Sequence, residues 1–325
     1  MKKNIILLVI VFAAFGTTLF AASNPIDLIS MIDSASLRQY AAPLVESYGV
    51  AMGSGWYNTA ESHKFLGFDL GLRFMLIQVP VADRTFDAHV RYCYFDPAQN
   101  DTVWVDTVVT TATLFGTRGT QSDWIPSGAV GVPPGLPGGL GISSMPFVLP
   151  QASVGLPFGL QLTARYIPWP FSGTTIQFLG FGLKEELTAL PVLSKSPVKV
   201  AVQGFYQKVA IGSALNSNTL GGNLQASVKL LMLTPYAGIG FDRTVMDINY
   251  TFNFKQPKFE AGPPPRFYTE DQSVVVKYAY KSAVNWRATI GVKANLGLAF
   301  VNLDYSHNLT SGYNAISAGT GIGLR

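Results

Sequence analysis

The sequence predicts an all-β fold, a transmembrane antiparallel β-barrel of about 12 to 14 strands with a short helical plug or tether at its N-terminus. Long runs with a two-residue period are the first observation behind this prediction. In residues 284–296, VNWRATIGVKANL, the even positions are apolar and the odd positions are polar or glycine. Because side chains alternate sides along a strand, one face of this run meets an apolar medium and the other a polar one.

Charge and length separate a membrane barrel from a soluble sheet. The polar face of this run carries Arg287 and Lys293, and the run exceeds the roughly 5 to 6 residues usual for a strand in a soluble protein. A barrel strand places its apolar face against lipid and its polar face in an aqueous lumen. A soluble exported β-sandwich is the alternative fold.

Residues 1–23 have the layout of a secretory signal peptide. Two lysines precede the apolar run Ile5–Phe15, and small residues follow at positions 21–23. A membrane anchor is the alternative, but the run is shorter than the roughly 17 to 25 apolar residues that a spanning helix needs. After residue 23 the sequence has no apolar segment of that length, so we expect an exported protein that enters a membrane through strands.

The net charge and the cysteine content say little about the function of the chain. The chain carries 23 Lys and Arg against 19 Asp and Glu, and removal of the two N-terminal lysines leaves 21 against 19, a net charge near +2. This balance gives no indication of nucleic-acid binding. The lone Cys93 cannot form an intramolecular disulfide.

Residues 24–63 depart from the strand pattern. Apolar residues recur at roughly helical spacing between Ile26 and Leu44, and a glycine-rich stretch follows at 48–57. One or two short helices are therefore predicted. The segment acts either as a plug in the lumen or as a periplasmic tether, and the sequence favours neither.

The two-residue period governs residues 64–325, the predicted barrel. Two stretches interrupt it, at about 112–146 and about 257–271, where Gly and Pro are too dense for a helix or a strand ladder. The strand number depends on whether Tyr236–Phe254 is one strand or two. Closure is expected because every unpaired edge group of an open sheet in lipid costs several kcal/mol.

Strand parity assigns a set of basic residues to the lumen, where they outnumber the inward acids. This excess would favour an anionic solute or the carboxylate of a lipid. Alternatively, the inward charges pair in ladders that fill and stiffen a narrow barrel. The predicted lumen-lining basic residues are Arg73, Arg91, Arg165, Lys184, Lys199, Lys229, Lys255, Lys277, Arg287 and Lys293.

Catalytic and metal-binding patterns are weak. Ser306-His307-Asn308, with Ser311 nearby, could supply the Ser and His of an outer-membrane lipid hydrolase, but this spacing is typical of a polar hairpin turn. We therefore expect no enzyme, with a lipid hydrolase as a minor alternative. The three histidines show no metal-ligand spacing, and Gly135–Gly141 lacks the Lys and the helix of a phosphate loop, so no metal or cofactor is expected.

Several segments resemble those of a known protein family. They are residues 40–73, TLFGT at 113–117, residues 151–168 and 178–187, LTPYAGIG at 233–240 and TIGVKAN at 289–295. Over most of its length the chain resembles an uncharacterised family of outer-membrane β-barrel proteins of Gram-negative bacteria. More distantly, its layout is similar to the long-chain fatty-acid transporter type of barrel.

The resemblance implies an outer-membrane location but supplies no functional residues. The chain ends in Arg325, whereas such barrels usually end in an aromatic residue that the assembly machinery reads. The predicted function is the binding or passage of a small hydrophobic or anionic compound through a partly plugged lumen. A structural or adhesive surface barrel with a filled core is the alternative. Expected partners are outer-membrane lipids, such a solute and, during biogenesis, the barrel assembly machinery.

Overall fold

A computed structural model describes residues 34–96, 101–117, 138–171, 174–189, 196–212, 215–260 and 266–324. The predicted signal peptide, residues 1–23, lies outside the described residues. The described chain forms two compact units, one within residues 1–44 and 79–143 and the other within residues 45–78 and 144–325. The helix α3 (Ser34–Gly53) contributes its first half to the smaller unit and its second half to the larger one.

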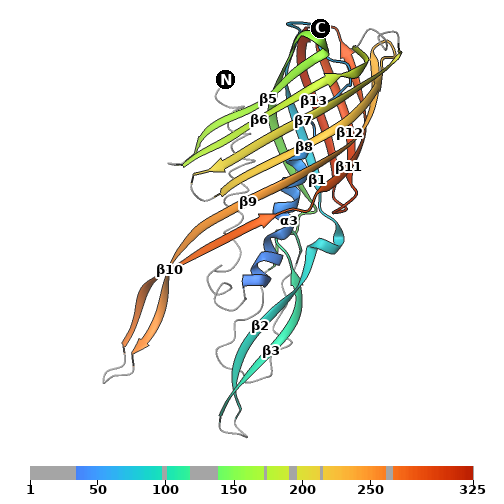
Figure 1. The fold of residues 1–325 in the computed structure, drawn as a ribbon. Helices are drawn as coiled ribbons and strands as arrows, with labels where there is room; N and C mark the ends of the chain where they lie inside the picture. The colour runs from blue at the N-terminus through green and yellow to red at the C-terminus, as the bar shows by residue number, and fades with distance from the viewer. Residues whose placement is uncertain are drawn as a thin grey trace. The chain divides into compact units, whose positions relative to one another are not determined.

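The larger unit is built on an 11-stranded sheet that closes on itself (Figure 1). Closure follows from the strand pairings, because β1 pairs with both β13 and β4, and β9 pairs with both β8 and β11. All these pairings are antiparallel. The strands are β1 (Phe68–Gln78), β4 (Ser144–Gly155), β5 (Leu160–Phe171), β6 (Thr174–Glu186), β7 (Val198–Ile211), β8 (Leu215–Val228), β9 (Leu233–Glu260), β10 (Arg266–Lys281), β11 (Asn285–Leu296), β12 (Ala299–Asn308) and β13 (Asn314–Leu324).

Strands β10 and β11 lie along the same edge of β9. Strand β10 pairs with residues 245–260 and β11 with residues 233–242. Between them, Ser282–Val284 oppose only Arg243 and Thr244, and the Ser282 amide donates to the Thr244 carbonyl at 2.8 Å. This two-against-three mismatch is a β-bulge. The closed ring β9-β11-β12-β13-β1-β4-β5-β6-β7-β8 therefore has ten positions, and an even strand number is usual in single-chain transmembrane β-barrels.

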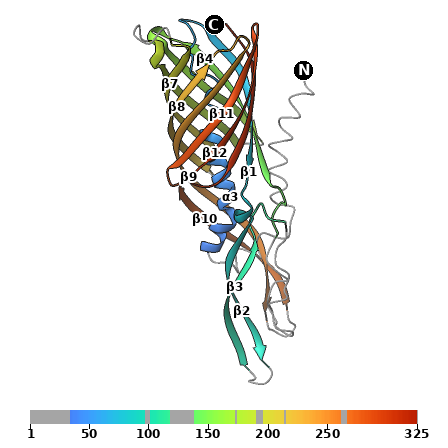
Figure 2. The same cartoon turned by 90° about the vertical axis from the view of Figure 1, so that its right-hand side faces the viewer.

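The predicted strand number is too high, for two reasons. Residues 86–94 and 102–111 belong to a separate hairpin, β2 (Thr85–Asp96) and β3 (Asp101–Ala112), which forms its own two-stranded sheet (Figure 2). Residues Tyr236–Phe254 lie in the single strand β9. The hairpin was mistaken for barrel strands because any two-faced hairpin alternates polar and apolar residues in the same way.

The predicted loop at about 257–271 is also mostly strand. Pro257 lies in β9 and pairs with Thr269 of β10, and within this range only residues 261–265 fall outside the described chain. The predicted loop at about 112–146 contains the start of β4, and residues 118–137 are not among those described.

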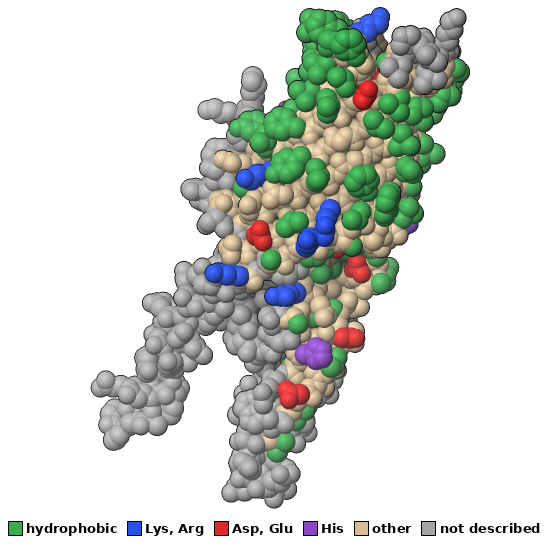
Figure 3. Space-filling view, in the orientation of Figure 1, with side chains coloured by type: hydrophobic (Ala, Val, Ile, Leu, Met, Phe, Trp, Pro, Cys, Tyr) green, Lys and Arg blue, Asp and Glu red, His purple; other side chains and the backbone are tan. Residues whose placement is uncertain are grey.

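The barrel wall is apolar outside and polar inside. Along β1 the exposed residues Phe68, Leu70 and Leu72 alternate with the buried Asp69 and Arg73. Figure 3 shows hydrophobic side chains spread over the visible face of this wall. Large exposed apolar surfaces are rare on soluble monomers, whereas a lipid-facing band requires one. No helix of the described chain combines the length and the hydropathy needed to cross a membrane.

The smaller unit contains the first half of α3, the 3-10 helix η1 (Val81–Arg84) and the β2–β3 hairpin. Ala88, Val90 and Val109 form a small apolar core of the hairpin, with Phe86 packed against it. Phe86 in turn meets Tyr40 of α3 edge-to-face, with ring centroids 6.3 Å apart. Two further 3-10 helices, η3 (Pro157–Gly159) and η4 (Leu187–Ala189), follow β4 and β6 in the larger unit.

Candidate functional site: the plugged lumen and a hollow in the barrel wall

The segment 45–62, here called the plug, comprises the second half of α3 and the turns after it, and its side chains pack on the inner wall. Trp56 stacks on Phe205 of β7, with ring centroids 4.7 Å apart and planes 18° from parallel. Tyr57 meets Tyr236 of β9 edge-to-face at 5.9 Å. Burial raises the pKa of the Tyr57 phenol, so this group stays neutral and remains a hydrogen-bond donor.

Four inward basic residues, here called the clamp, hold the plug by its oxygen atoms. The donor–acceptor distances are 2.9 Å from Arg165 Nη2 to the Ser54 carbonyl, 2.5 Å from Arg287 Nη2 to the Gly53 carbonyl, 3.0 Å from Lys184 Nζ to the Glu61 carbonyl and 3.2 Å from Lys293 Nζ to Asn58 Oδ1. Carbonyls at the C-terminus of a helix lack intrahelical partners and carry partial negative charge. The end of α3 therefore attracts the two arginines.

Arg287 also forms an ion pair with Asp242 of β9. The Nη1–Oδ1 distance is 2.7 Å, and the two side chains are 4% and 0% exposed. A Cβ added at Gly53 would lie 2.3 Å from Asp242 Oδ1. Only glycine therefore lets the end of α3 approach this pair.

Arg165 sits at the centre of a second set of contacts. Its Nε donates to Gln151 Oε1 at 2.9 Å, and its guanidinium carbon lies 3.9 Å from the centroid of the Trp56 ring. Trp56 is thus held between a cation on one face and Phe205 on the other. Such stacked cation–aromatic arrangements gain strength when they are shielded from water.

The structure places the predicted lumen-lining residues in several environments. Those buried inside the barrel are Arg73, Arg165, Lys184, Arg287 and Lys293. Lys199 is partly buried and lies 3.3 Å from Glu186. Lys229, directly after β8, and Lys277, on β10, are exposed.

Two of the predicted residues lie where their side chains are not described. Lys255 is on β9, and Arg91 is on β2, which belongs to the smaller unit. Arg91 is therefore not on a strand of the barrel ring, so the strand parity behind its predicted lumen position does not apply to it.

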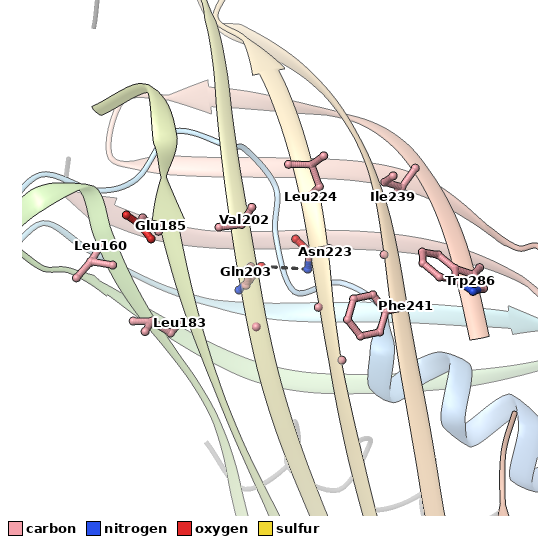
Figure 4. A pocket seen from close by; sticks show the side chains of 14 residues that line it. Leu160, Leu183, Glu185, Val202, Gln203, Asn223, Leu224, Ile239, Phe241 and Trp286 are labelled. Atoms are coloured by element: carbon pink, nitrogen blue, oxygen red, sulfur yellow. Dashed lines mark hydrogen bonds between the residues drawn. The ribbon is translucent and has the colours of Figure 1, made fainter. Parts of the chain in front are cut away.

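An apolar hollow of about 550 Å³ lies in the barrel wall over β7, β8 and β9 (Figure 4). Gly204 and Gly222 are directly paired in the ladder, so no side chain fills the wall at this point. A Cβ added at Gly204 would meet no atom within 4 Å. The residues around the hollow include the exposed apolar side chains Leu183, Val202, Leu224, Ile239, Phe241 and Trp286.

Two amide side chains line the hollow beneath the glycines. Asn223 Nδ2 donates to Gln203 Oε1 at 3.4 Å, and both residues are buried. The hollow therefore combines an apolar wall with a small polar floor. The sequence did not reveal it, because Gly204 and Gly222 become neighbours only through strand pairing.

The candidate hydrolase residues do not form a nucleophile–base pair. The Ser306 hydroxyl lies 2.7 Å from that of Thr289, whereas His307 Nδ1 lies 2.7 Å from Asn314 Oδ1. Asn308 Oδ1 accepts hydrogen bonds from the Thr310 and Ser311 amides, as in a polar turn. Among the described residues, no three His, Cys, Asp or Glu side chains lie close enough together to hold a metal.

Comparison with known proteins gives a family and a general architecture. The sequence profile of DUF6588, described as a family of unknown function, matches residues 1–324. This match confirms the predicted resemblance to an uncharacterised family. No curated protein matches the chain in sequence.

The similar solved structures are outer-membrane β-barrels. A loop L8 deletion mutant of OmpT, an outer membrane protein of Vibrio cholerae, is 10% identical with a TM-score of 0.27, over 79% of this chain and 98% of that one. The translocator domain of the autotransporter NalP from Neisseria meningitidis is 9% identical with a TM-score of 0.23, over 90% and 98%. The transport unit of the autotransporter AIDA-I from Escherichia coli is 10% identical with a TM-score of 0.26, over 87% and 99%. These values carry no information about the activity of this chain.

Proposed function

Since the chain belongs to DUF6588, a family of unknown function, we propose its role from its own geometry: an outer-membrane β-barrel that binds a small hydrophobic compound in the hollow over β7, β8 and β9. The hollow is the observation that carries this proposal. Its volume falls within the roughly 300 to 1,000 Å³ that ligand pockets occupy. It opens on the apolar outer surface, so a hydrophobic compound reaches it from the lipid.

The composition of the hollow defines the ligand class. Phe241 and Trp286, with ring centroids 5.7 Å apart, offer an aromatic wall, and the Gln203 and Asn223 amides offer one polar region. The exposed Glu185 of β6 also lines the hollow, at its edge nearer Leu160 (Figure 4). A pocket with this composition orients a mostly apolar molecule that carries a single polar group. Binding rather than catalysis is proposed, supported by the separate partners of Ser306 and His307.

Filling the hollow tests the proposal. The probe is N-phenyl-1-naphthylamine, an uncharged hydrophobic fluorophore, titrated into purified protein in detergent micelles. Gly204→Leu is sterically permitted, because the added side chain starts in open space. We expect it to weaken probe binding at least about tenfold, equivalent to about 1.4 kcal/mol.

The chain offers a matched control for this variant. A second apolar hollow, of about 390 Å³, lies over β11, β12 and β13 and is lined in part by Ala318. Ala318→Leu fills this second hollow and should leave probe affinity at the wild-type value. Equal affinity for the wild-type protein and Gly204→Leu would contradict the proposed site.

A structural barrel with a filled core is the second candidate. The clamp favours it, because the buried cations are occupied by plug oxygens rather than facing an open channel. The two roles are compatible, since the hollow lies on the outer face. Conductance measured in planar lipid bilayers separates a closed from an open lumen.

A further inference from the structure

One end of the barrel, where β1 begins and β13 ends, carries bulky apolar residues on its connections. We call Leu66, Phe158, Leu231, Met232 and Leu298 the apolar rim. Phe158 is 91% exposed and Leu231 is 94% exposed. Leu66, Phe158 and Leu231 adopt φ values of 62°, 63° and 54°, a conformation in which bulky residues are rare. In Figure 3 hydrophobic side chains gather at this end of the barrel.

The rim is continuous with the outer apolar band at several strands, although the exposed Lys64, Glu185 and Lys229 lie at the same end of the barrel. Exposed Phe68 follows Leu66 along the chain, exposed Leu233 follows Met232, and Leu324 ends β13 at the same level, since it pairs with Phe68. Turns that end in water normally carry polar residues. At Leu66, Phe158 and Leu231 the connections instead expose apolar side chains.

A cavity of about 400 Å³ opens beside the rim. Leu231, Met232 and Leu298 lie at its apolar part, and Lys229 is exposed next to them. Its other lining residues with charge or polarity include His63, Asp69 and Lys293. The same cavity is therefore lined by both apolar and basic side chains.

The buried polar groups of the cavity favour an anion. His63 is 7% exposed; its Nε2 lies 2.7 Å from Asp69 Oδ2, while its Nδ1 is buried with no hydrogen-bond partner among the described residues. The Lys293 ammonium lies 4.2 Å from the Phe300 ring centroid. Among the described residues that line the cavity, two ammonium groups thus outnumber the one side-chain carboxylate, which His63 already contacts. A buried polar atom without a hydrogen-bond partner in the protein usually bonds to a water molecule or a ligand.

From this arrangement we propose that the cavity binds the phosphate headgroup of one anionic phospholipid, whose acyl chains lie against the apolar rim. Lys229 interacts with the phosphate, and the rim is immersed in the bilayer rather than in water. A free phosphate would use Lys229 but leave Leu231, Met232 and Leu298 exposed, whereas a lipid would both neutralise the cation and cover these side chains. The inference requires a membrane-spanning barrel but does not depend on the hollow over β7, β8 and β9.

Native mass spectrometry of the detergent-solubilised protein tests the proposal. The probes are phosphatidylglycerol and phosphatidylcholine with identical acyl chains. We expect the wild-type protein to retain one phosphatidylglycerol about tenfold more tightly than phosphatidylcholine, and Lys229→Gln to lose most of that preference. Lys208→Gln, which removes a lysine of β7 that is also exposed, is the matched control and should behave as wild type.

Three further measurements of lipid retention separate the proposed lipid site from the alternatives. Leu231→Ser should weaken the binding of both lipids and keep the preference, because it removes only apolar contact. Inorganic phosphate at millimolar concentration should not displace the lipid, and displacement would overturn the lipid assignment in favour of a free anion. Gly204→Leu should leave lipid retention unchanged, which separates this site from the proposed hydrophobic-compound site. Equal retention of the two lipids, or equal losses in Lys229→Gln and Lys208→Gln, would also overturn the proposal.

Discussion

Arg287 joins three parts of the larger unit through one guanidinium. It lies on β11, pairs with Asp242 of β9 and donates to the Gly53 carbonyl of the plug. Removing two opposite charges from water is costly, and their attraction offsets this cost only while both partners remain. The pair is therefore sensitive to the loss of one member and tolerant of the loss of both.

Arg287→Met should lower the free energy of unfolding by about 3 to 5 kcal/mol, because it leaves Asp242 buried without its cation. The double variant Arg287→Met, Asp242→Leu should recover most of that loss. Urea unfolding of the protein in detergent micelles, followed by tryptophan fluorescence, measures both values. A double variant as unstable as the single one would show that the plug contact, not the ion pair, dominates.

The sequence pattern predicts which face of a strand a side chain occupies, but it does not predict which atoms that side chain contacts. Strand parity predicts which face of a strand Arg165 or Lys184 occupies, because lipid and lumen impose opposite polarity on alternate residues. The acceptors are carbonyls of residues 53–61, and a carbonyl has no signature in the sequence. Whether inward charge selects a solute or binds a plug therefore could not be predicted.

Among the elements, the plug depends most on Trp56. The indole lies between the Arg165 guanidinium and the Phe205 ring, and its Nε1 donates to the Met52 carbonyl at 2.8 Å. One side chain thus connects the end of α3 to β5 and β7. Its loss would leave a void too large for the neighbouring side chains to close.

Trp56→Ala should loosen the plug, at a cost of about 3 to 5 kcal/mol for truncating a buried tryptophan. In planar lipid bilayers we expect no steady conductance from the wild-type protein and intermittent openings from this variant. Trp286→Ala, which truncates an exposed tryptophan of the outer wall, is the control and should stay closed. Steady wild-type conductance would contradict a plugged lumen.

The strands show where periodicity is informative and where it fails. It predicted the alternation of β1, β6 and β11, since the two faces of a barrel strand meet different media. It placed Pro257 in a loop because proline cannot donate a ladder hydrogen bond. Beyond Ile248, β9 pairs with β10 alone, and an edge strand tolerates proline.

For the whole ring, connection length predicts orientation in the membrane. Short turns join β8 to β9 and β11 to β12 at the end where β1 begins, whereas residues 79–143 join β1 to β4 at the opposite end. Outer-membrane barrels have short periplasmic turns and longer extracellular loops. The end with the apolar rim is therefore expected to face the periplasm.

Cysteine labelling of intact cells checks this orientation. In a Cys93→Ser background, Ser311→Cys in the β12–β13 turn should react with a membrane-impermeant maleimide. Ser196→Cys lies in the β6–β7 connection, at the end of the barrel that carries the apolar rim. It should react only after the outer membrane is permeabilised. The reverse pattern would invert the proposed orientation.

The clamp has a consequence for how the chain assembles. Its contacts with Ser54, Gly53 and Asn58 bridge 111, 234 and 235 positions of sequence, and the plug directly precedes β1. The ring closes only when β13, the last strand, meets β1. Each clamp contact formed beforehand shortens the loop that this final pairing must close and lowers its entropic cost. We therefore expect the lysines and arginines inside the barrel to bring late strands back to the start of the chain during assembly, in addition to holding the plug in the finished barrel.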